Sequence, residues 1–511
     1  SRMPLSPSTS SGPFQQLAEE LQEKMEGEVR FDEGAQAIYA ADASHYRQVP
    51  IGVVLPKHPE DVIQAVQICK KFDVPILSRG GGTSVAGQGC NAAVVMDMSK
   101  YMNRILEINP KERTARVQPG VILDDLLRET QKHQLIFGPD PSTHSRCTLG
   151  GMIGNDACGI HSLLAGRTIH NVLELDILTY EGKRMRVASG EQAVWMQGSG
   201  EQHEVLTKLK HLRERYGSLI RDHFPKIPRR VSGYSLDQLL DENGFDVAKS
   251  LVGTEGTCVI ILEAKLRLIP NPSHRSLAVL GFPDICQAAD AVPGILKFGP
   301  IGFEAVEGSM IENIRNKKFY LENIEMLPPG QSWLLVEFGG MTFPEVQKQT
   351  KNLVSFLEGQ ETPLDFKIYE NPSEQRRIWA LREFGPGAAV FVPGKKDAWP
   401  GWEDSAVAPE NLGSYLRDLR KLFDQYQYEG AFYGHFGDGC VHVRLNFDFD
   451  SEEGLRQYRS FVEEAAGLVV RYGGSFSGEH GDGQARGELL EKMYGKEIVQ
   501  AFREFKAIWD P

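Results

Sequence analysis

The chain lacks the features that would place it quickly among membrane, secreted or nucleic-acid-binding proteins. No apolar run is long enough to span a bilayer, and the polar, Ser/Pro-rich residues 1–13 have no apolar core of a signal peptide. No block of lysine and arginine stands out and the net charge is −13, which argues against a nucleic-acid partner. The composition does not exclude binding of a small anionic ligand, which needs only a local basic pocket. It also does not exclude peripheral association with a membrane.

Cysteine occurs in an odd number and in no metal-binding pattern. No two cysteines are spaced as C-x-x-C, so neither a disulfide framework nor a zinc ribbon is expected, and no cluster-binding run lies within the chain. A reducing compartment fits best, and we expect a cytoplasmic protein, with the inner face of the membrane as an alternative location. The seven cysteines are Cys69, Cys90, Cys147, Cys158, Cys258, Cys286 and Cys440.

With 511 residues the chain is too long for one simple core, so we expect two or three domains. Residues 14–45 have the pattern of a short helical lead-in. Apolar strands at 51–55 and 74–77 flank a helix that opens at His58-Pro59, where proline and two acidic residues suit the first turn. This pattern predicts a β–α–β unit. Further strands are predicted at 93–96, 105–108 and 114–117, and a helix at 123–133.

A glycine-rich loop follows the second strand of that unit. Its residues include Arg79, Gly80, Gly81, Gly82, Thr83, Ser84, Gly87 and Gln88. Glycines let several backbone N–H groups approach one anion, and Ser, Thr and Arg can add donors, so a diphosphate is the natural ligand. The loop does not have the G-x-G-x-x-G pattern that opens a helix in nicotinamide-binding domains. A tight loop without a ligand is the alternative.

Two more glycine-rich stretches lie at residues 147–159 and 253–257, and a proline-rich stretch lies at 137–143. Small residues let a flat ligand lie against the backbone. Because the stretches are spread over about 180 residues, they favour one long ligand bound along a single domain over three separate sites.

Beyond a boundary near residues 270–272, strands and helices alternate to about residue 470. Strands are predicted at 303–307 and 333–338, an amphipathic helix at 411–427, and one final helix at 492–508.

The second half also contains the strongest chemical motif. Asp-Gly at 438–439 predicts a two-residue hairpin turn, and a hairpin centred there places His435 opposite His442. Two imidazoles at that distance can bind one divalent ion. Glu479 could add a third ligand and leave a position open, as in catalytic metal sites, with His480 then available as a base. A longer loop would shift the register, and packed histidines without a metal are the alternative.

Five motifs together resemble those of the FAD-linked dehydrogenases of the vanillyl-alcohol oxidase type, and in particular their D-2-hydroxyacid dehydrogenase branch, which includes D-lactate, D-2-hydroxyglutarate and glycolate dehydrogenases. The resemblance runs from about residue 35 to the end, and it is greatest to large members whose flavoprotein part is followed by an iron–sulfur module. The motifs are R-G-G-G-T-S-x-x-G-Q at 79–88, C-T-L-G-G-M-I at 147–153, G-T-E-G-T at 253–257, G-H-F-G-D-G-x-x-H at 434–442 and G-E-H-G at 478–481.

This resemblance implies an α+β fold. A PCMH-type FAD-binding domain of two α/β lobes would be joined to a cap domain whose antiparallel sheet is covered by helices. We expect a helical lead-in at 1–45, the FAD-binding domain at 46–272, the substrate and cap domain with the metal site at 273–485, and a helix returning to the FAD domain at 486–511.

The resemblance also implies where FAD binds. The diphosphate would lie on residues 79–84 and on Gly87 and Gln88. Some relatives tether the flavin through a histidine at the position of Thr83, so we expect FAD to be non-covalent here. The remaining contacts would come from Pro139, Ser142, Thr148, Gly150, Gly151, Asn155, Gly159, Glu255, Gly256 and Val259.

For the metal and the base, the resemblance implies a divalent ion, such as zinc, iron or manganese, on His435, His442 and Glu479. The adjacent His480 would be the catalytic base. The ion would lower the pKa of a substrate hydroxyl, and the base would take its proton.

Three cationic residues are implied in substrate binding. Arg382 matches the family's carboxylate-binding arginine, against the alternative of a surface ion pair with Glu383 or another neighbour. Lys396 lies where relatives often place a second anion contact. Arg444 stands where several relatives have asparagine, and its guanidinium could bind a second carboxylate or clamp the first one.

The activity implied is oxidation of a small D-2-hydroxycarboxylate, similar to D-lactate or D-2-hydroxyglutarate, to the 2-keto acid by hydride transfer to FAD. The electron acceptor would be a quinone, a cytochrome, an electron-transfer flavoprotein or an iron–sulfur module. Two alternatives are an FAD oxidoreductase of another alcohol or an ether lipid, and a non-catalytic flavoprotein subunit for electron transfer.

Overall fold

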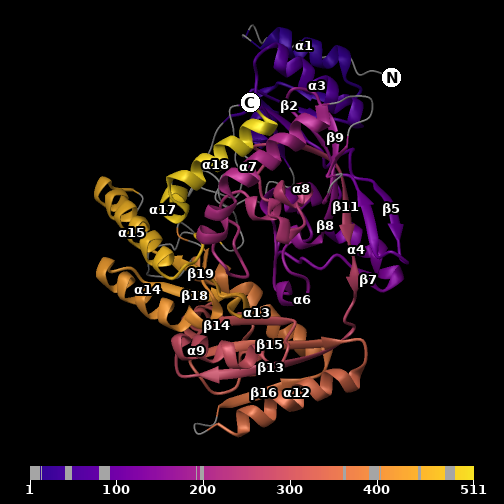
Figure 1. Ribbon diagram of the computed structural model, residues 1–511. Helices are drawn as coiled ribbons and strands as arrows, with labels where there is room; N and C mark the ends of the chain where they lie inside the picture. The colour runs from indigo at the N-terminus through magenta and orange to yellow at the C-terminus, as the bar shows by residue number, and fades with distance from the viewer. Residues whose placement is uncertain are drawn as a thin grey trace.

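The computed structural model describes residues 12, 14–40, 49–79, 93–190, 193–195, 201–360, 364–390, 402, 404–446, 450–477 and 489–511, with the backbone alone at 201–202 and 388–390. Every structural statement below refers to these residues. Figure 1 shows the indigo and magenta first half above the orange second half, and the yellow C-terminal helix α18 (Lys496–Trp509) lies against the first half.

The first lobe is a small sheet in the order β1-β2-β4-β3. Its central strands are parallel, because β2 and β3 both pair in parallel with β4, and α3 connects β2 to β3. The predicted β–α–β unit is therefore confirmed. The lead-in is helical only in part, since a strand lies between its two helices. The elements are α1 (Gln15–Lys24), β1 (Glu28–Arg30), α2 (Glu33–Ile38), β2 (Gly52–Leu55), α3 (Pro59–Lys71), β3 (Ile76–Arg79) and β4 (Val94–Asp97).

The second lobe is a six-stranded sheet in the order β10-β9-β8-β11-β6-β5. Its strand β11 pairs antiparallel with β8 and β6, and buried residues alternate with less buried ones along it, as expected for a sheet with one face in a core. The strands are β5 (Ile105–Asn109), β6 (Thr114–Val117), β8 (Val172–Leu178), β9 (Arg184–Val187), β10 (Val194–Trp195) and β11 (Ile260–Arg267), and the α-helices of this region are α4 (Leu123–Thr130), α5 (Leu149–Asn155), α6 (Ser162–Ala165), α7 (Glu201–His223) and α8 (Val247–Ser250).

A short antiparallel pair, β7 (Leu135–Ile136) with β12 (Ile269–Pro270), lies where the chain leaves the second lobe for the second half. The second half is built on one antiparallel sheet in the order β16-β13-β15-β14-β18-β19-β17. The strands are β13 (His274–Phe282), β14 (Gly302–Glu307), β15 (Ser332–Gly340), β16 (Asp365–Tyr369), β17 (Asp404–Ala406), β18 (Gly430–Gly434) and β19 (Cys440–Leu445).

Helices cover both faces of this sheet. One face packs against α9 (Ile285–Leu296), α12 (Phe343–Glu358) and α14 (Leu412–Tyr426), in one continuous core with the second lobe. The other face packs against α10 (Gly308–Asn316), α11 (Leu321–Ile324) and α13 (Pro372–Val390). The predicted α+β class, with an antiparallel cap sheet covered by helices, is confirmed.

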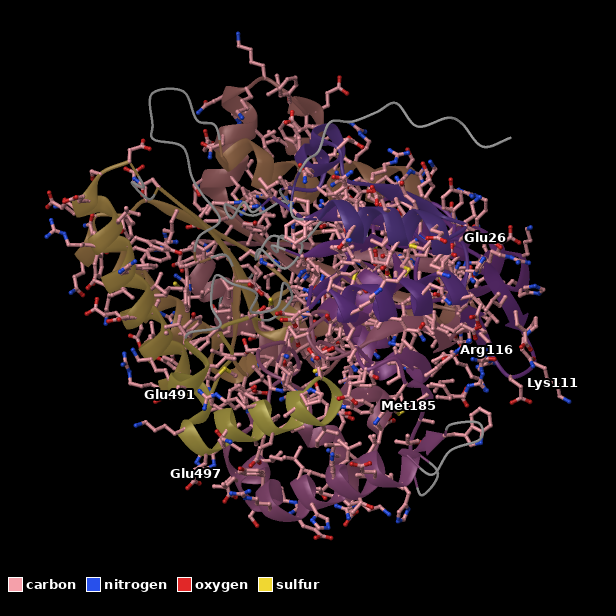
Figure 2. The ribbon with its side chains drawn as sticks, turned by 90° about the horizontal axis from the view of Figure 1, so that it is seen from above. Glu26, Lys111, Arg116, Met185, Glu491 and Glu497 are labelled. Atoms are coloured by element: carbon pink, nitrogen blue, oxygen red, sulfur yellow. The ribbon has the colours of Figure 1, made fainter. Side chains whose placement is uncertain are left out.

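The C-terminal region differs from the prediction of one helix at 492–508. It contains α15 (Glu452–Arg471) and then two helices, α17 (Leu490–Tyr494) and α18, which are separated at Gly495. Gly495 has φ 82°, a conformation that ends the helix and favours glycine. Viewed from above, Glu491 and Glu497 project outward from these two helices (Figure 2), and the opposite face of α18 packs against α7. Within the described ranges, no helix is both long and apolar enough to cross a bilayer.

Candidate active site

A row of buried polar side chains lies on the α13 face of the cap sheet. Successive residues of a strand point to opposite faces. Phe303 and Ala305 of β14 therefore join the core with α9, whereas Glu304 between them meets groups on the other side. Glu304 and Glu337 are both buried and lie on the same face, because Gly302 pairs with Glu337 in the β14–β15 ladder. Polar groups in such a place need partners, and their partners define the site.

The structure corrects the predicted hairpin register. In the β18–β19 ladder Tyr433, not His435, stands opposite His442. The connection is longer than two residues, because the 3₁₀ turn Phe436–Asp438 is followed by Gly439 at φ 71°. His435 precedes this turn, and its ring still approaches that of His442, with centroids 5.1 Å apart and planes at 80°. The two histidines therefore come together from a loop and a strand.

One carboxylate connects the first histidine to the predicted carboxylate-binding arginine. Glu304 Oε2 lies 2.8 Å from His435 Nδ1. Its Oε1 accepts a hydrogen bond from Arg382 Nε at 3.1 Å and forms an ion pair with Arg382 Nη2 at 3.0 Å. Burial raises the pKa of Glu304, but His435 and Arg382 outweigh burial and lower that pKa below its usual value. Arg382 is itself only 9% exposed, so its ion pair is buried rather than on the surface, and its partner is Glu304.

Two guanidinium groups lie over the same aromatic ring. The guanidinium carbon of Arg382 is 5.0 Å from the Tyr433 ring centroid, and that of Arg444 is 6.0 Å from it. Tyr433 also contacts His442, with ring centroids 5.2 Å apart. Arg444 follows His442 by two residues and so shares its face of β19. The ring of Tyr433 is thus the common neighbour of both arginines and one histidine.

The residues that precede the predicted third ligand contact β17, the strand that pairs with β19 at His442. Asp404 pairs with His442 in the β17–β19 ladder, and Ser477 Oγ donates to Asp404 Oδ2 at 3.3 Å. The backbone N–H of Ser477 donates to Ser232 Oγ at 3.0 Å, and its carbonyl accepts from Val231 N–H at 3.1 Å. These contacts fix the position of Ser477, two residues before Glu479.

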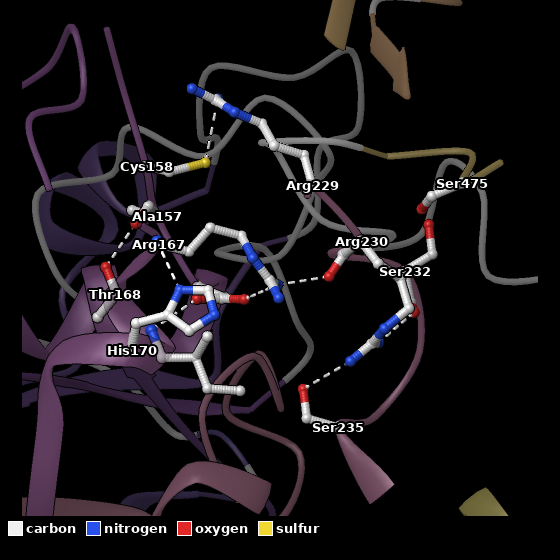
Figure 3. A network of polar contacts seen from close by, with 12 residues as sticks. Ala157, Cys158, Arg167, Thr168, His170, Arg229, Arg230, Ser232, Ser235 and Ser475 are labelled. Atoms are coloured by element: carbon white, nitrogen blue, oxygen red, sulfur yellow. Dashed lines mark hydrogen bonds and ion pairs between the residues drawn. The ribbon is translucent and has the colours of Figure 1, made fainter. Parts of the chain in front are cut away.

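A buried arginine joins the two halves next to the histidine loop. Arg229 Nε donates to Asp438 Oδ2 at 2.9 Å, and the same guanidinium donates to Ser162 Oγ at 2.7 Å and Cys158 Sγ at 3.1 Å. Asp438 lies between His435 and His442, whereas Cys158 and Ser162 belong to the first half. Figure 3 shows Arg229 directed toward Cys158 while the next residue, Arg230, is directed away to Ser235.

The predicted cofactor segments of the first half are brought together. Gly253 N–H donates to Ile153 O and Glu255 N–H to Gly154 O, each at 2.8 Å, which joins the segment 253–257 to α5 with Gly150, Gly151 and Asn155. Thr148 caps α5 and accepts from Gly151 N–H at 3.1 Å. Gly159 packs so closely on Asp140 that an added Cβ would lie 1.9 Å from the Asp140 carbonyl oxygen, so the segment containing Pro139 and Ser142 joins them.

A cavity of about 210 Å³ extends this region to the end of β3. Gly256 and Val259, two predicted cofactor contacts, line it together with Ile76 and Ser78. Arg79, the next residue, donates from Nη1 to Tyr39 O at 3.0 Å and lies over the Tyr39 ring.

Several predicted site residues lie outside the described residues, namely Gly80, Gly81, Gly82, Thr83, Ser84, Gly87, Gln88, Lys396, Glu479 and His480. Among the residues that are described, no group of three His, Cys, Asp or Glu side chains could hold a metal. His435 and His442 are among these described residues, whereas Glu479 is not.

Sequence reasoning missed Glu304, Tyr433, Arg229 and Asp438 as parts of this site. Glu304 carried a usable signal, because it stands between apolar residues in a strand that is otherwise buried. Arg229 carried none, since its partners are distant in the sequence.

Comparison with known proteins identifies the class. Residues 50–188 match the family described as FAD binding domain, and residues 271–511 match the family described as FAD linked oxidases, C-terminal domain. The first part of the chain therefore matches an FAD-binding family and the second part a family of FAD-linked oxidases, and these matches support FAD as the cofactor.

Particular relatives follow from the same comparison. D-2-hydroxyglutarate dehydrogenase of Haemophilus influenzae is 30% identical over 510 residues, which covers 95% of this chain and 49% of that protein. Glycolate oxidase subunit GlcD of Escherichia coli is 26% identical, with 92% of this chain and 83% of that protein covered. The chain spans about half the length of the D-2-hydroxyglutarate dehydrogenases it matches.

Solved structures agree on the fold. p-Cresol methylhydroxylase is 15% identical with a TM-score of 0.67, and the match covers 98% of this chain and 95% of that chain. Alkyldihydroxyacetonephosphate synthase is 17% identical with a TM-score of 0.63, and the match covers 97% and 83%.

Proposed function

We propose that this chain is the catalytic flavoprotein part of an FAD-dependent dehydrogenase that oxidises a D-2-hydroxyacid to the 2-keto acid. The observation that carries the proposal is the buried carboxylate of Glu304, which contacts both His435 and Arg382. A group that binds a substrate carboxylate and a group that binds a metal are thereby held at a fixed separation. A 2-hydroxycarboxylate carries its carboxylate and its hydroxyl on adjacent carbons and suits such a pair.

The described residues fit FAD. Ser78 Oγ is buried and has no hydrogen-bond partner among the described residues, and it lines the same cavity as Gly256 and Val259. A buried hydroxyl of this kind calls for a ligand atom. We assign FAD to this cavity, to the glycine-rich loop that starts after β3, and to the segments containing Pro139, Thr148 and Glu255.

Two of the three proposed ligands of a divalent metal are described, and both are buried histidines. His435 and His442 are each 4% exposed, and His435 Nδ1 contacts the carboxylate of Glu304. A carboxylate on one ring nitrogen orients the imidazole and fixes the other nitrogen as the metal ligand. Glu479 follows Ser477 by two residues in the sequence, and Ser477 bonds to Asp404, the strand partner of His442. We assign His435, His442 and Glu479 as the metal ligands.

The chemistry divides among these groups. When bound, FAD accepts the C2 hydrogen of the substrate as a hydride, and the metal lowers the pKa of the substrate hydroxyl. Arg382 holds the substrate carboxylate, because its fork-shaped guanidinium can bind a carboxylate bidentately while Glu304 orients it. His480 takes the hydroxyl proton. The product is the 2-keto acid, and the electrons pass to a quinone, a cytochrome, an electron-transfer flavoprotein or an iron–sulfur module.

Among D-2-hydroxyacids, the site favours one with a second carboxylate. Arg444 and Arg382 lie over the same Tyr433 ring, so two cationic groups lie at neighbouring positions. Lys396 could add a third contact. The similarity to D-2-hydroxyglutarate dehydrogenases supports the same choice, and D-lactate, with one carboxylate, is the second candidate.

The direct test is anaerobic bleaching of the flavin absorbance by matched D- and L-2-hydroxyacids, using the FAD-loaded protein. We expect rapid bleaching by a D-acid with two carboxylates and much slower bleaching by its L-enantiomer. A protein that holds FAD but is reduced by no hydroxyacid would overturn the proposal in favour of another alcohol or a non-catalytic role. His480→Asn should abolish bleaching and leave FAD bound, whereas the same change at the exposed His274 should alter neither.

A further inference from the structure

His161 lies between two carboxylates that come from different halves of the molecule. Its Nδ1 is 2.5 Å from Asp140 Oδ2, and its Nε2 is 2.6 Å from Glu337 Oε1. Its backbone N–H also donates to Asp140 Oδ1 at 3.0 Å. An ionised carboxylate only accepts hydrogen bonds, so both ring nitrogens must donate, and only the imidazolium form of histidine can do so.

The charges around His161 support that form. The groups that face it are Asp140, Glu337 on β15 and Arg275 on β13, whose Nη1 is 3.4 Å from His161 Nε2 and 3.2 Å from Glu337 Oε1. Burial lowers the pKa of His161, but the charges of Asp140 and Glu337 and their hydrogen bonds outweigh burial and raise it to about 10. His161 is therefore cationic at neutral pH.

Glu337, the carboxylate on one side of His161, also contacts α13, the helix that carries Arg382. Trp379 Nε1 donates to Glu337 Oε2 at 3.2 Å, and Trp379 precedes Arg382 by three residues on α13, which puts both on one side of the helix. Gly302 of β14 lies against the His161 ring, because a Cβ added there would be 3.4 Å from His161 Cδ2.

The other end of the contact is in the predicted flavin-binding region. Asp140 lies between Pro139 and Ser142, and Gly159, two residues before His161, packs on the Asp140 backbone. A single ring thus joins the cofactor side of the site to the substrate side.

We propose that His161 is a positioning residue of the dehydrogenase: its imidazolium holds Glu337, and with it the turn of α13 that carries Arg382, against Asp140 in the flavin-binding region. Its effect on catalysis rests on the proposed function, whereas the charged contact itself does not. Loss of the contact leaves Asp140 and Glu337 without the cation between them, with Arg275 still on Glu337, and lets α13 move relative to the cofactor. Because a displacement of about 1 Å can cost up to about 100-fold in rate, small movements of Arg382 matter.

The test compares His161→Gln with His144→Gln in the FAD-loaded protein. His144 is a matched control, because its Nδ1 lies 2.8 Å from Asp124 but its side chain is 54% exposed. We expect His161→Gln to retain FAD, to raise the KM for the hydroxyacid about tenfold or more, and to lower kcat by a smaller factor. His144→Gln should match the wild type. Wild-type KM and kcat in an FAD-loaded His161→Gln protein would overturn the proposal.

Two further measurements keep the test decisive. In the wild type the KM should rise as pH passes through about 10, the pKa of His161, whereas it should be high and flat in His161→Gln. If His161→Gln does not fold, Trp379→Phe, which removes only the indole N–H, should still raise the KM; an unchanged KM would count against the proposal.

The proposal also has a test that does not depend on activity. The pKa of His161 in the folded state, about 10, is above its ordinary value of about 6.5. The charged contact therefore contributes fully to stability below about pH 6.5, and this contribution is lost as the pH rises through about 10. The melting temperature of the wild type should therefore be higher than that of His161→Gln up to about pH 8, and the difference between the two melting temperatures should shrink toward pH 10. A difference that does not change with pH would overturn the proposal, even if no hydroxyacid reduced the wild type and the proposed function itself had failed.

Discussion

The rings of His435 and His442 lie 5.1 Å apart, centroid to centroid, although the two residues are not opposite each other in the β18–β19 ladder. Their approach predicts that metal content depends on both rings. We expect His442→Ala to lose its bound divalent ion and to keep FAD, as measured by elemental analysis and flavin absorbance on the same sample. His274→Ala, at an exposed histidine of β13, is the control and should keep both. Full metal content in His442→Ala would remove this residue from the ligand set.

The carboxylate of Glu304, which contacts His435, should increase the affinity for the metal. Glu304→Gln keeps the shape of the side chain and removes its charge, so His435 loses the partner that orients it. Loss of such a partner typically weakens metal binding about 10- to 100-fold. Titration with a metal-chelating dye would measure the change, and an affinity equal to that of the wild type would show that Glu304 serves Arg382 alone.

Arg382 should determine substrate affinity. We expect Arg382→Ala to lower kcat/KM for the hydroxyacid about 100-fold or more, because an ion-paired hydrogen bond to a desolvated carboxylate is lost. Arg382→Lys keeps the charge but loses the bidentate fork, so its loss should be smaller, about tenfold. Arg377 on the same helix is the control, since its side chain is 43% exposed and its contact with Glu322 is 3.6 Å long. Equal losses at Arg377 would point to a general effect on α13.

Arg444 should discriminate between substrates. If Arg444 binds a second carboxylate, Arg444→Ala should lower kcat/KM for D-2-hydroxyglutarate about tenfold or more. It should change kcat/KM for D-lactate little. If Arg444 instead binds the first carboxylate, kcat/KM should fall by the same factor for both acids. The ratio of the two kcat/KM values decides between the two roles, and an unchanged ratio would exclude the second-carboxylate role.

The sequence anticipated strands and helices well where local pattern determines them. The β–α–β unit around α3, the strands β14 and β15, and helix α14 all lie where periodicity predicts them. The break of the last helix at Gly495 was missed because a single glycine inside a periodic segment does not show whether its φ is positive.

The hairpin register was missed for a different physical reason. Asp-Gly at 438–439 is a strong local signal for a two-residue turn, yet Asp438 is held by Arg229 and Ser162 from the other half of the molecule. Those contacts favour a longer loop. The same limit applies to Glu304, whose contact with His435 depends on β14 and β18 being neighbours in the sheet, an arrangement that local pattern does not contain.

The buried pair of Arg229 with Asp438 should stabilise the molecule far more than a surface pair of the same kind. The side chains of Arg229 and Asp438 are 1% and 7% exposed, whereas those of Arg417 and Asp290, a closely bonded pair, are 45% and 48% exposed. Removing one partner from a buried pair leaves a charge without compensation and typically costs about 3–5 kcal/mol, against about 0–1 kcal/mol at the surface. We therefore expect Asp438→Asn to lower the melting temperature by several degrees and Asp290→Asn to change it little.

Because Asp438 lies in the loop between His435 and His442, the Asp438→Asn variant should also bind metal more weakly. An Asp438→Asn protein with the wild-type melting temperature and metal affinity would show that the other partners of Arg229, which include Ser162, Cys158 and the Gly159 carbonyl, satisfy it without Asp438. It would also show that the histidine loop does not need this contact between the two halves.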